Sequence, residues 1–188
     1  MKDNKTLIFK ILLASTLVAI AVTWRIINHN YSFAPNLELV TVGAVLAAIA
    51  LGASWAIIVP LAAIIISDLI IGNSSIFIFT WGSFALIGAG SILLAKLNKQ
   101  PKKQLLASAG FAVAGSFTFF IITNLGVWLQ GWYPATIAGL TACFTLAIPF
   151  YRTMLIGNLI IVPVSVSIYQ LVRAKIVAKN LVIDSSVS

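Results

Sequence analysis

Residues 37–71 read LELVTVGAVLAAIALGASWAIIVPLAAIIISDLII, and this apolar run decides how the chain can fold. One membrane-spanning helix needs about 20 apolar residues, because the hydrocarbon core of a bilayer is ~30 Å thick. The run is too long for a single helix, and Gly52-Ala53-Ser54 interrupts it. We therefore predict two consecutive spans here, a shorter one over residues 37–51 and a second over residues 55–71.

The same apolar character extends outward over the whole chain of 188 residues, of which 61% are hydrophobic and 9% are charged. A soluble domain does not carry so much apolar material, because most of its surface faces water. We predict an all-α integral membrane protein with a single transmembrane domain, residues 1–188. The first apolar run lacks a signal-peptide cleavage site and is interpreted as a retained span. The remaining predicted spans are residues 7–24, 76–97, 105–125 and 151–172, with an outer loop carrying a short helix at residues 126–150.

The positions of the 12 lysines and arginines test this count of six spans. Ten of them form clusters before the first span, between the fourth and fifth, and after the last. With six spans all three clusters face one side, which the positive-inside rule makes cytoplasmic. We therefore predict cytoplasmic termini and a multi-pass location in the plasma membrane, and the net charge of +8 is no indication of nucleic-acid binding. The clusters are Lys2, Lys5 and Lys10; Lys96, Lys99, Lys102 and Lys103; and Arg173, Lys175 and Lys179.

The two remaining basic residues, Arg25 and Arg152, fall at the outer ends of the first and last spans. Charges within a membrane are costly and are functional candidates by default. Either arginine could form a structural ion pair with Glu38 or Asp68. Alternatively, the arginines line a pocket open to the outside, where a guanidinium binds an anionic group and aromatic rings stack on a flat ligand. Both interpretations can hold together, while a proton or sodium site at Asp68 would lack a second nearby acid.

Catalytic and metal-binding motifs are missing from the sequence. A single cysteine, Cys143, and a single histidine, His29, leave almost no ligands for a zinc site. The sequence contains no phosphate-binding G-x-x-x-x-G-K-[ST], no H-E-x-x-H and no G-x-S-x-G. We predict no enzyme activity, no metal and no cofactor.

Three stretches carry a resemblance to a known family: SFAPNLELVTVGA (32–44), VPLAAIIISDLIIG (59–72) and FFIITNLGVWLQGWYPATIAGLTACFTLAIPFYRTMLIGNL (119–159). They resemble a bacterial and archaeal membrane protein family related to the substrate-binding S-components of energy-coupling factor (ECF) vitamin transporters. The resemblance implies a six-helix subunit that captures a small micronutrient outside the cell. Such a subunit docks on a transmembrane coupling protein driven by two cytoplasmic ATPases.

The resemblance also suggests roles for particular residues. In S-components an Ala-x-x-x-Ala on the first helix contacts the coupling protein, and Ser15-x-x-x-Ala19 is a near variant with the small residues that permit close helix approach. The arginines and aromatic residues favour an anionic, aromatic ligand. Two alternatives stay open, a structural six-span scaffold and a small secondary transporter, although residues 1–97 and 98–188 show no convincing inverted repeat. The candidate substrate-binding residues are Arg25, His29, Asp68, Asn124, Trp128, Tyr133, Arg152 and Asn158.

Overall fold

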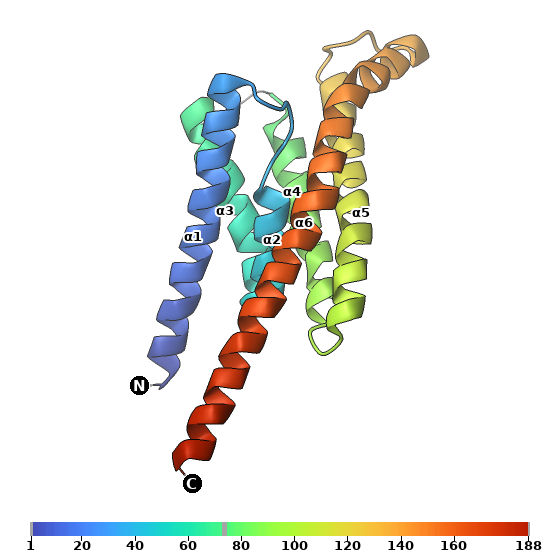
Figure 1. Cartoon of the computed structure of the whole chain (residues 1–188). Helices are drawn as coiled ribbons and strands as arrows, with labels where there is room; N and C mark the ends of the chain where they lie inside the picture. Colours follow the sequence, from blue (N-terminus) through green and yellow to red (C-terminus); the bar gives the residue numbers. More distant parts are fainter. Residues whose placement is uncertain (1, 73–74, 188) are drawn as a thin grey trace.

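The computed structural model describes residues 2–72 and 75–187, with side chains for residues 4–72 and 75–178. Within this part the chain is all-helical, with six helices and no strand (Figure 1). The predicted all-α class is confirmed, whereas the side chains of Lys2 and Lys179 in the basic clusters lie outside the described residues. The helices are α1 (Lys2–Tyr31), α2 (Val40–Ala50), α3 (Ala53–Ile71), α4 (Phe77–Ala95), α5 (Pro101–Leu129) and α6 (Ile137–Val187).

Five of these helices are long and apolar enough to cross a membrane, and α2 is the exception. Its 11 residues make a helix of roughly 16 Å, about half the thickness of the hydrocarbon core. The predicted break is confirmed at Gly52, which has φ of 110° between α2 and α3. Residues 32–39 form an irregular segment that descends from the end of α1 into the bundle before α2 begins (Figure 1).

Side chains of α1 bind the backbone of this irregular segment. Asn28 donates from Nδ2 to the carbonyls of Ala34 (2.8 Å) and Leu37 (3.1 Å), and its Oδ1 accepts the Ala34 N–H at 3.0 Å. The Trp24 indole N–H donates to the Leu37 carbonyl at 2.8 Å. Irregular backbone at membrane depth is tolerated only where protein satisfies its polar groups. Trp24 and Asn28 therefore make the descent of the chain beside α1 possible.

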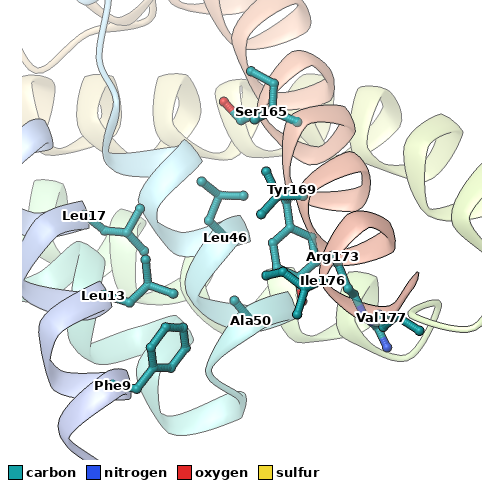
Figure 2. A pocket seen from close by; sticks show the side chains of 12 residues that line it. Phe9, Leu13, Leu17, Leu46, Ala50, Ser165, Tyr169, Arg173, Ile176 and Val177 are labelled. Carbon is teal, nitrogen blue, oxygen red and sulfur yellow. The ribbon is translucent and has the colours of Figure 1, made fainter. Parts of the chain in front are cut away.

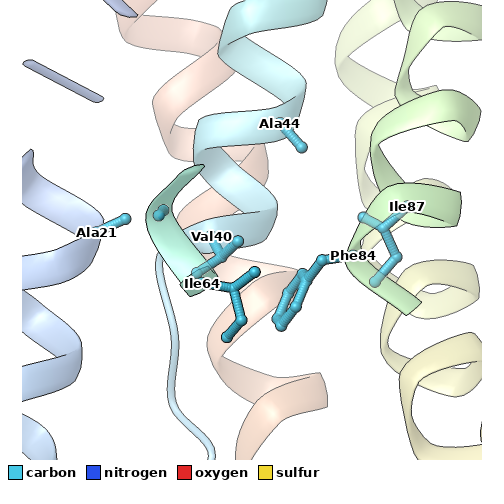
Figure 3. Close-up of a cluster of buried hydrophobic side chains, with 7 residues drawn as sticks. Ala21, Val40, Ala44, Ile64, Phe84 and Ile87 are labelled. Atoms are coloured by element: carbon cyan, nitrogen blue, oxygen red, sulfur yellow. The ribbon is translucent and has the colours of Figure 1, made fainter. Parts of the chain in front are cut away.

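Helix α2 lies in the core of the bundle, and nine of its 11 residues are buried. A helix that is apolar on all sides is stable only when neighbours cover every face. Figure 3 shows Val40 and Ala44 of α2 meeting side chains from three other helices. Those side chains are Ala21 of α1, Ile64 of α3, and Phe84 and Ile87 of α4.

The predicted outer loop at residues 126–150 is wrong in two respects. Helix α5 continues to Leu129, which leaves only residues 130–136 as a connection. The predicted short helix is the first part of α6, and α6 continues without a break through Pro149. This first part bends away from the rest of the bundle (Figure 1). A proline removes one backbone hydrogen bond and can bend a membrane helix without ending it.

Both chain ends lie at the same end of the bundle, together with the connection between α4 and α5 (Figure 1). Lys5 and Lys99 therefore share one end, and Ser32, which follows α1, lies at the other. The described members of the basic clusters therefore gather at one end of the bundle, and the prediction of a cytoplasmic side rests on this gathering.

We expect cysteines introduced as Lys5→Cys and Lys99→Cys to react with a membrane-impermeant maleimide only from the cytoplasm. Ser32→Cys should react only from outside, because Ser32 lies at the opposite end of the bundle. All three side chains are exposed and therefore accessible to the reagent. Each change is made in a Cys143→Ala background, which removes the native thiol. Labelling of Lys5→Cys and Lys99→Cys from opposite sides would show that residues 32–50 do not cross the membrane.

Candidate functional site

Two adjoining cavities lie at the end of the bundle opposite the chain termini. The larger, of about 440 Å³, is lined by residues of α1, α4, α5 and α6 and of the segments that connect the helices. The smaller, of about 280 Å³, lies between α1 and the irregular segment 32–39. Arg25, Asn36 and Phe150 line both cavities, so they form the boundary between the two.

Five aromatic side chains contribute to the wall of the larger cavity. The rings of Phe120 and Tyr151 pack with their centroids 4.7 Å apart. Thr80, Thr123 and Asn124 add a few polar groups. A mostly apolar cavity with a small number of placed polar groups is typical of a small-molecule site, and flat rings are its best-matched ligands. The aromatic lining residues are Phe119, Phe120, Trp132, Phe150 and Tyr151.

Arg25 is held in place by two neighbours on α3, and α4 in turn binds one of them. Its Nη2 forms an ion pair with Asp68 Oδ1 at 2.7 Å, and its Nε donates to Ser67 Oγ at 2.7 Å. The second carboxylate oxygen of Asp68 accepts the Trp81 indole N–H at 2.8 Å. Both oxygens of this buried carboxylate are therefore satisfied, and the guanidinium is fixed at the wall of the two cavities.

A second polar cluster lies deeper, where α2 begins. Glu38 is 5% exposed, and its two carboxylate oxygens accept the Thr41 N–H at 2.8 Å and the Asn158 amide at 3.0 Å. The same Asn158 nitrogen lies 3.2 Å from Ser116 Oγ. Glu38 therefore caps α2 and ties it to α5 and α6.

The structure brings together five of the predicted site residues. Arg25 and Asn124 line the larger cavity, and His29 lines the smaller one. Asp68 lies behind Arg25, and Asn158 lies against Glu38. The predicted ion pair between α1 and Asp68 is confirmed for Arg25.

The other three predicted residues lie away from the cavity walls. Trp128 donates to the Pro134 carbonyl at 3.0 Å, and Tyr133 is half-buried in the connection before α6. Arg152 is exposed and has no ion-pair partner in the part of the chain that the structure describes. Its suggested pairing with Asp68 or Glu38 is wrong. Successive residues of a helix point about 100° apart, so Tyr151 faces the cavity while Arg152 turns outward.

Sequence reasoning missed most of the cavity wall. Tyr151 and Phe150 precede Arg152 directly in the sequence. If Arg152 faces outward, a helix turns these neighbours toward the inside, and this reasoning could have identified them. Thr80 and Asn36 carried no signal, since single threonines and asparagines are common at helix ends and in loops.

The proposed docking residues Ser15 and Ala19 are both exposed on α1. They line an apolar groove of about 460 Å³ between α1 and α3, with Trp55 and Ile58 on the opposite wall. Small side chains at this position leave the α1 backbone accessible to a neighbouring helix.

A further apolar groove runs between α1 and α6 near the chain ends, with α2 as its floor. Figure 2 shows Leu13 and Leu17 of α1 facing Tyr169 and Ile176 of α6 across Leu46. The groove has a volume of about 580 Å³. Most of its lining side chains are apolar, so lipid acyl chains can fill it.

The long apolar helices, the buried ion pair and the aromatic cavity define an all-helical, multi-pass membrane protein with a candidate small-molecule site. The family model described as "Family of unknown function (DUF6580)" matches residues 5–181, and the chain belongs to this family. No curated protein and no solved structure matches it significantly.

Proposed function

We propose that this protein is the substrate-binding subunit of an ECF-type importer in the plasma membrane. The observation that carries the proposal is the larger cavity, in which Arg25 lies among aromatic rings. The cavity lies at the end opposite the basic clusters, which is the outer end under the positive-inside rule. The ligand is a small, flat micronutrient with a carboxylate or phosphate group.

Arg25 supplies the anion-binding group in this proposal. A guanidinium has five N–H donors, and the contacts with Ser67 and Asp68 occupy Nε and Nη2. The donors on Nη1 are then available to a ligand at the cavity wall. Asp68 and Ser67 hold the guanidinium in one orientation, which lowers the entropy lost when a ligand binds.

The groove that contains Ser15 and Ala19 supports docking on a transmembrane coupling protein. Both residues are exposed on the lipid-facing side of α1, and neither contributes to the buried core. A helix of the coupling protein can approach such a surface closely, and van der Waals packing then supplies the association energy. Two cytoplasmic ATPases complete the importer in this proposal.

We expect a flat, anionic compound to remain bound during purification in mild detergent and to appear in native mass spectrometry. Thr80→Phe fills part of the larger cavity and should remove this compound. Thr141→Phe, a change at an exposed position of α6, is the matched control and should retain it. Adding the identified compound back should raise the melting temperature of the wild type, because only a folded binder gains stability from a ligand.

The opposite result has a clear meaning. If the wild type carries no compound and no flat anion raises its melting temperature, the cavity is not a substrate site. A structural scaffold would then be the better account of the protein.

A further inference from the structure

The charged side chains are divided unevenly between the two ends of the bundle. Glu38 and Asp68 are the two acids whose side chains the structure describes, and both belong to the site opposite the chain termini. The other end carries basic side chains with no described acid among them. In a membrane, a surface of this charge attracts anionic lipid headgroups. The described basic side chains at this end are Lys5, Lys10, Lys96, Lys99, Lys102, Lys103, Arg173 and Lys175.

The apolar groove between α1 and α6 at this end has the length of one acyl chain. Along α6 its lining extends from Ser165 to Val177, a rise of roughly 18 Å at 1.5 Å per residue. The hydrocarbon of one leaflet is about 15 Å thick, which is half of the bilayer core. All lining side chains except those of Ser165, Tyr169 and Arg173 are apolar. The groove therefore accommodates one acyl chain that runs along α6.

Hydrogen bonds fix the walls of this groove. The Tyr169 hydroxyl donates to the Ile49 carbonyl at 3.2 Å, and Asn98 Nδ2 donates to the same carbonyl at 3.2 Å. The last turn of α2, which forms the floor, is thereby joined to α6 and to the connection between α4 and α5. Because the groove is already formed before a lipid enters it, binding requires little ordering of the protein.

A second groove, of about 690 Å³, lies between α6 and the start of α5. Its lining is mixed, and it includes the amide side chains of Asn98 and Gln170. Arg173 and Val177 line both grooves, so the two grooves adjoin at this turn of α6. Figure 2 shows Arg173 beside Ile176 and Val177 on the α6 wall of the apolar groove. An apolar groove that meets a more polar one matches an amphiphile whose charged group lies at the junction.

Arg173 has hydrogen-bond donors to offer at this junction. Residues 153–172 carry no charge and are about as long as one span, which places Arg173 at the level of the lipid phosphates. Arg173 is exposed, donates from Nη1 to the Asn98 carbonyl at 3.4 Å, and makes no ion pair within the described part of the chain. A guanidinium has five N–H donors and binds a phosphate bidentately. The remaining donors of Arg173 can therefore bind one phosphate group.

We propose that this end of the protein binds one anionic phospholipid, with the phosphate on Arg173 and one acyl chain in the groove between α1 and α6. A zwitterionic lipid brings its own cationic group among the basic side chains and gains no net charge attraction. The lipid site lies at the opposite end from the proposed substrate cavity, goes beyond the proposed function and is tested without any substrate.

The test adds lipids to the purified full-length protein in an uncharged detergent and measures bound lipid by native mass spectrometry. Phosphatidylglycerol and phosphatidylcholine with identical acyl chains are compared. We expect phosphatidylglycerol to bind roughly fivefold more tightly, which is the attraction of one basic residue for an anionic membrane surface. Equal affinities would overturn the proposal. Displacement of the lipid by inorganic phosphate would also overturn it, because a phosphate site without an acyl chain would then explain the binding.

Two variants of α6 test the phosphate contact. Arg173→Gln should weaken the binding of phosphatidylglycerol by roughly fivefold and abolish the preference over phosphatidylcholine. Lys175→Gln is the matched control, because it removes the same charge from an exposed position of the same helix but lines neither groove. It should keep the preference. Equal losses in the two variants would overturn the site, since they would indicate a general attraction to the basic surface.

A second pair of variants tests the acyl-chain contact. Ile168 lines the apolar groove and is 56% exposed, so Ile168→Trp should narrow the groove without disturbing the core. We expect this change to weaken the binding of both lipids. Ile160→Trp is the matched control, because Ile160 is 60% exposed on the same helix and lines neither groove, and it should leave binding unchanged. Unchanged binding in Ile168→Trp would place the acyl chain outside the groove and overturn the proposal.

Discussion

Arg25→Gln is expected to lower the free energy of unfolding by about 3–5 kcal/mol, which is the usual cost of removing one partner from a buried ion pair. The change leaves Asp68 charged and only 7% exposed, with the Trp81 indole and no cation beside it. Ser67 also loses the hydrogen bond that its hydroxyl oxygen accepts from Arg25 Nε. Thermal or denaturant unfolding of the purified protein in uncharged detergent measures the loss.

A double change separates the ion pair from other effects of the substitution. Arg25→Gln with Asp68→Asn replaces both charges by amides and should recover most of the lost stability, because no unpaired charge is left. Arg152→Gln is the control, since this exposed arginine has no ion-pair partner in the described part of the chain, and it should change stability by no more than about 0.5 kcal/mol. A double variant no more stable than Arg25→Gln alone would contradict the argument.

The second large effect is expected for Gly88→Ala, at the place where α3 and α4 cross. A Cβ added to Gly88 would overlap the carbonyl oxygen of Ala56 and lie 3.2 Å from the Ile57 Cα. These are backbone atoms of a packed helix, so relief requires the two helices to move apart. Overpacking of this kind typically costs about 1–3 kcal/mol, and we expect a value near the upper end.

Gly82→Ala on the same helix provides the matched control. A Cβ at Gly82 meets no atom within 4 Å, so alanine should stabilise α4 by roughly 0.5–1 kcal/mol through its better helix propensity. Unfolding of both variants under the same conditions gives the comparison. Similar stability changes at Gly88 and Gly82 would mean that α3 and α4 do not cross as closely as the structure describes.

The helical class and the division of the chain could be predicted because both depend on local properties. Apolar runs long enough for a bilayer are visible residue by residue, since each backbone group in lipid must be satisfied within its own helix. The break between residues 37–51 and 55–71 followed from run length and from Gly52. Arg25 was predicted as a site residue for the same reason, because a charge in an apolar run is a local anomaly.

The tertiary structure alone decided which residues meet. Asp68 pairs with Arg25 and not with Arg152, and Asn158 binds Glu38 across 120 positions of sequence. These choices depend on how each helix is rotated about its axis. Helices that are apolar on every face carry no periodic pattern that marks the buried side. The sequence therefore determined where helices and charges occur, while packing in three dimensions determined the cavity walls, the partners of each charge and the passage of α6 through Pro149.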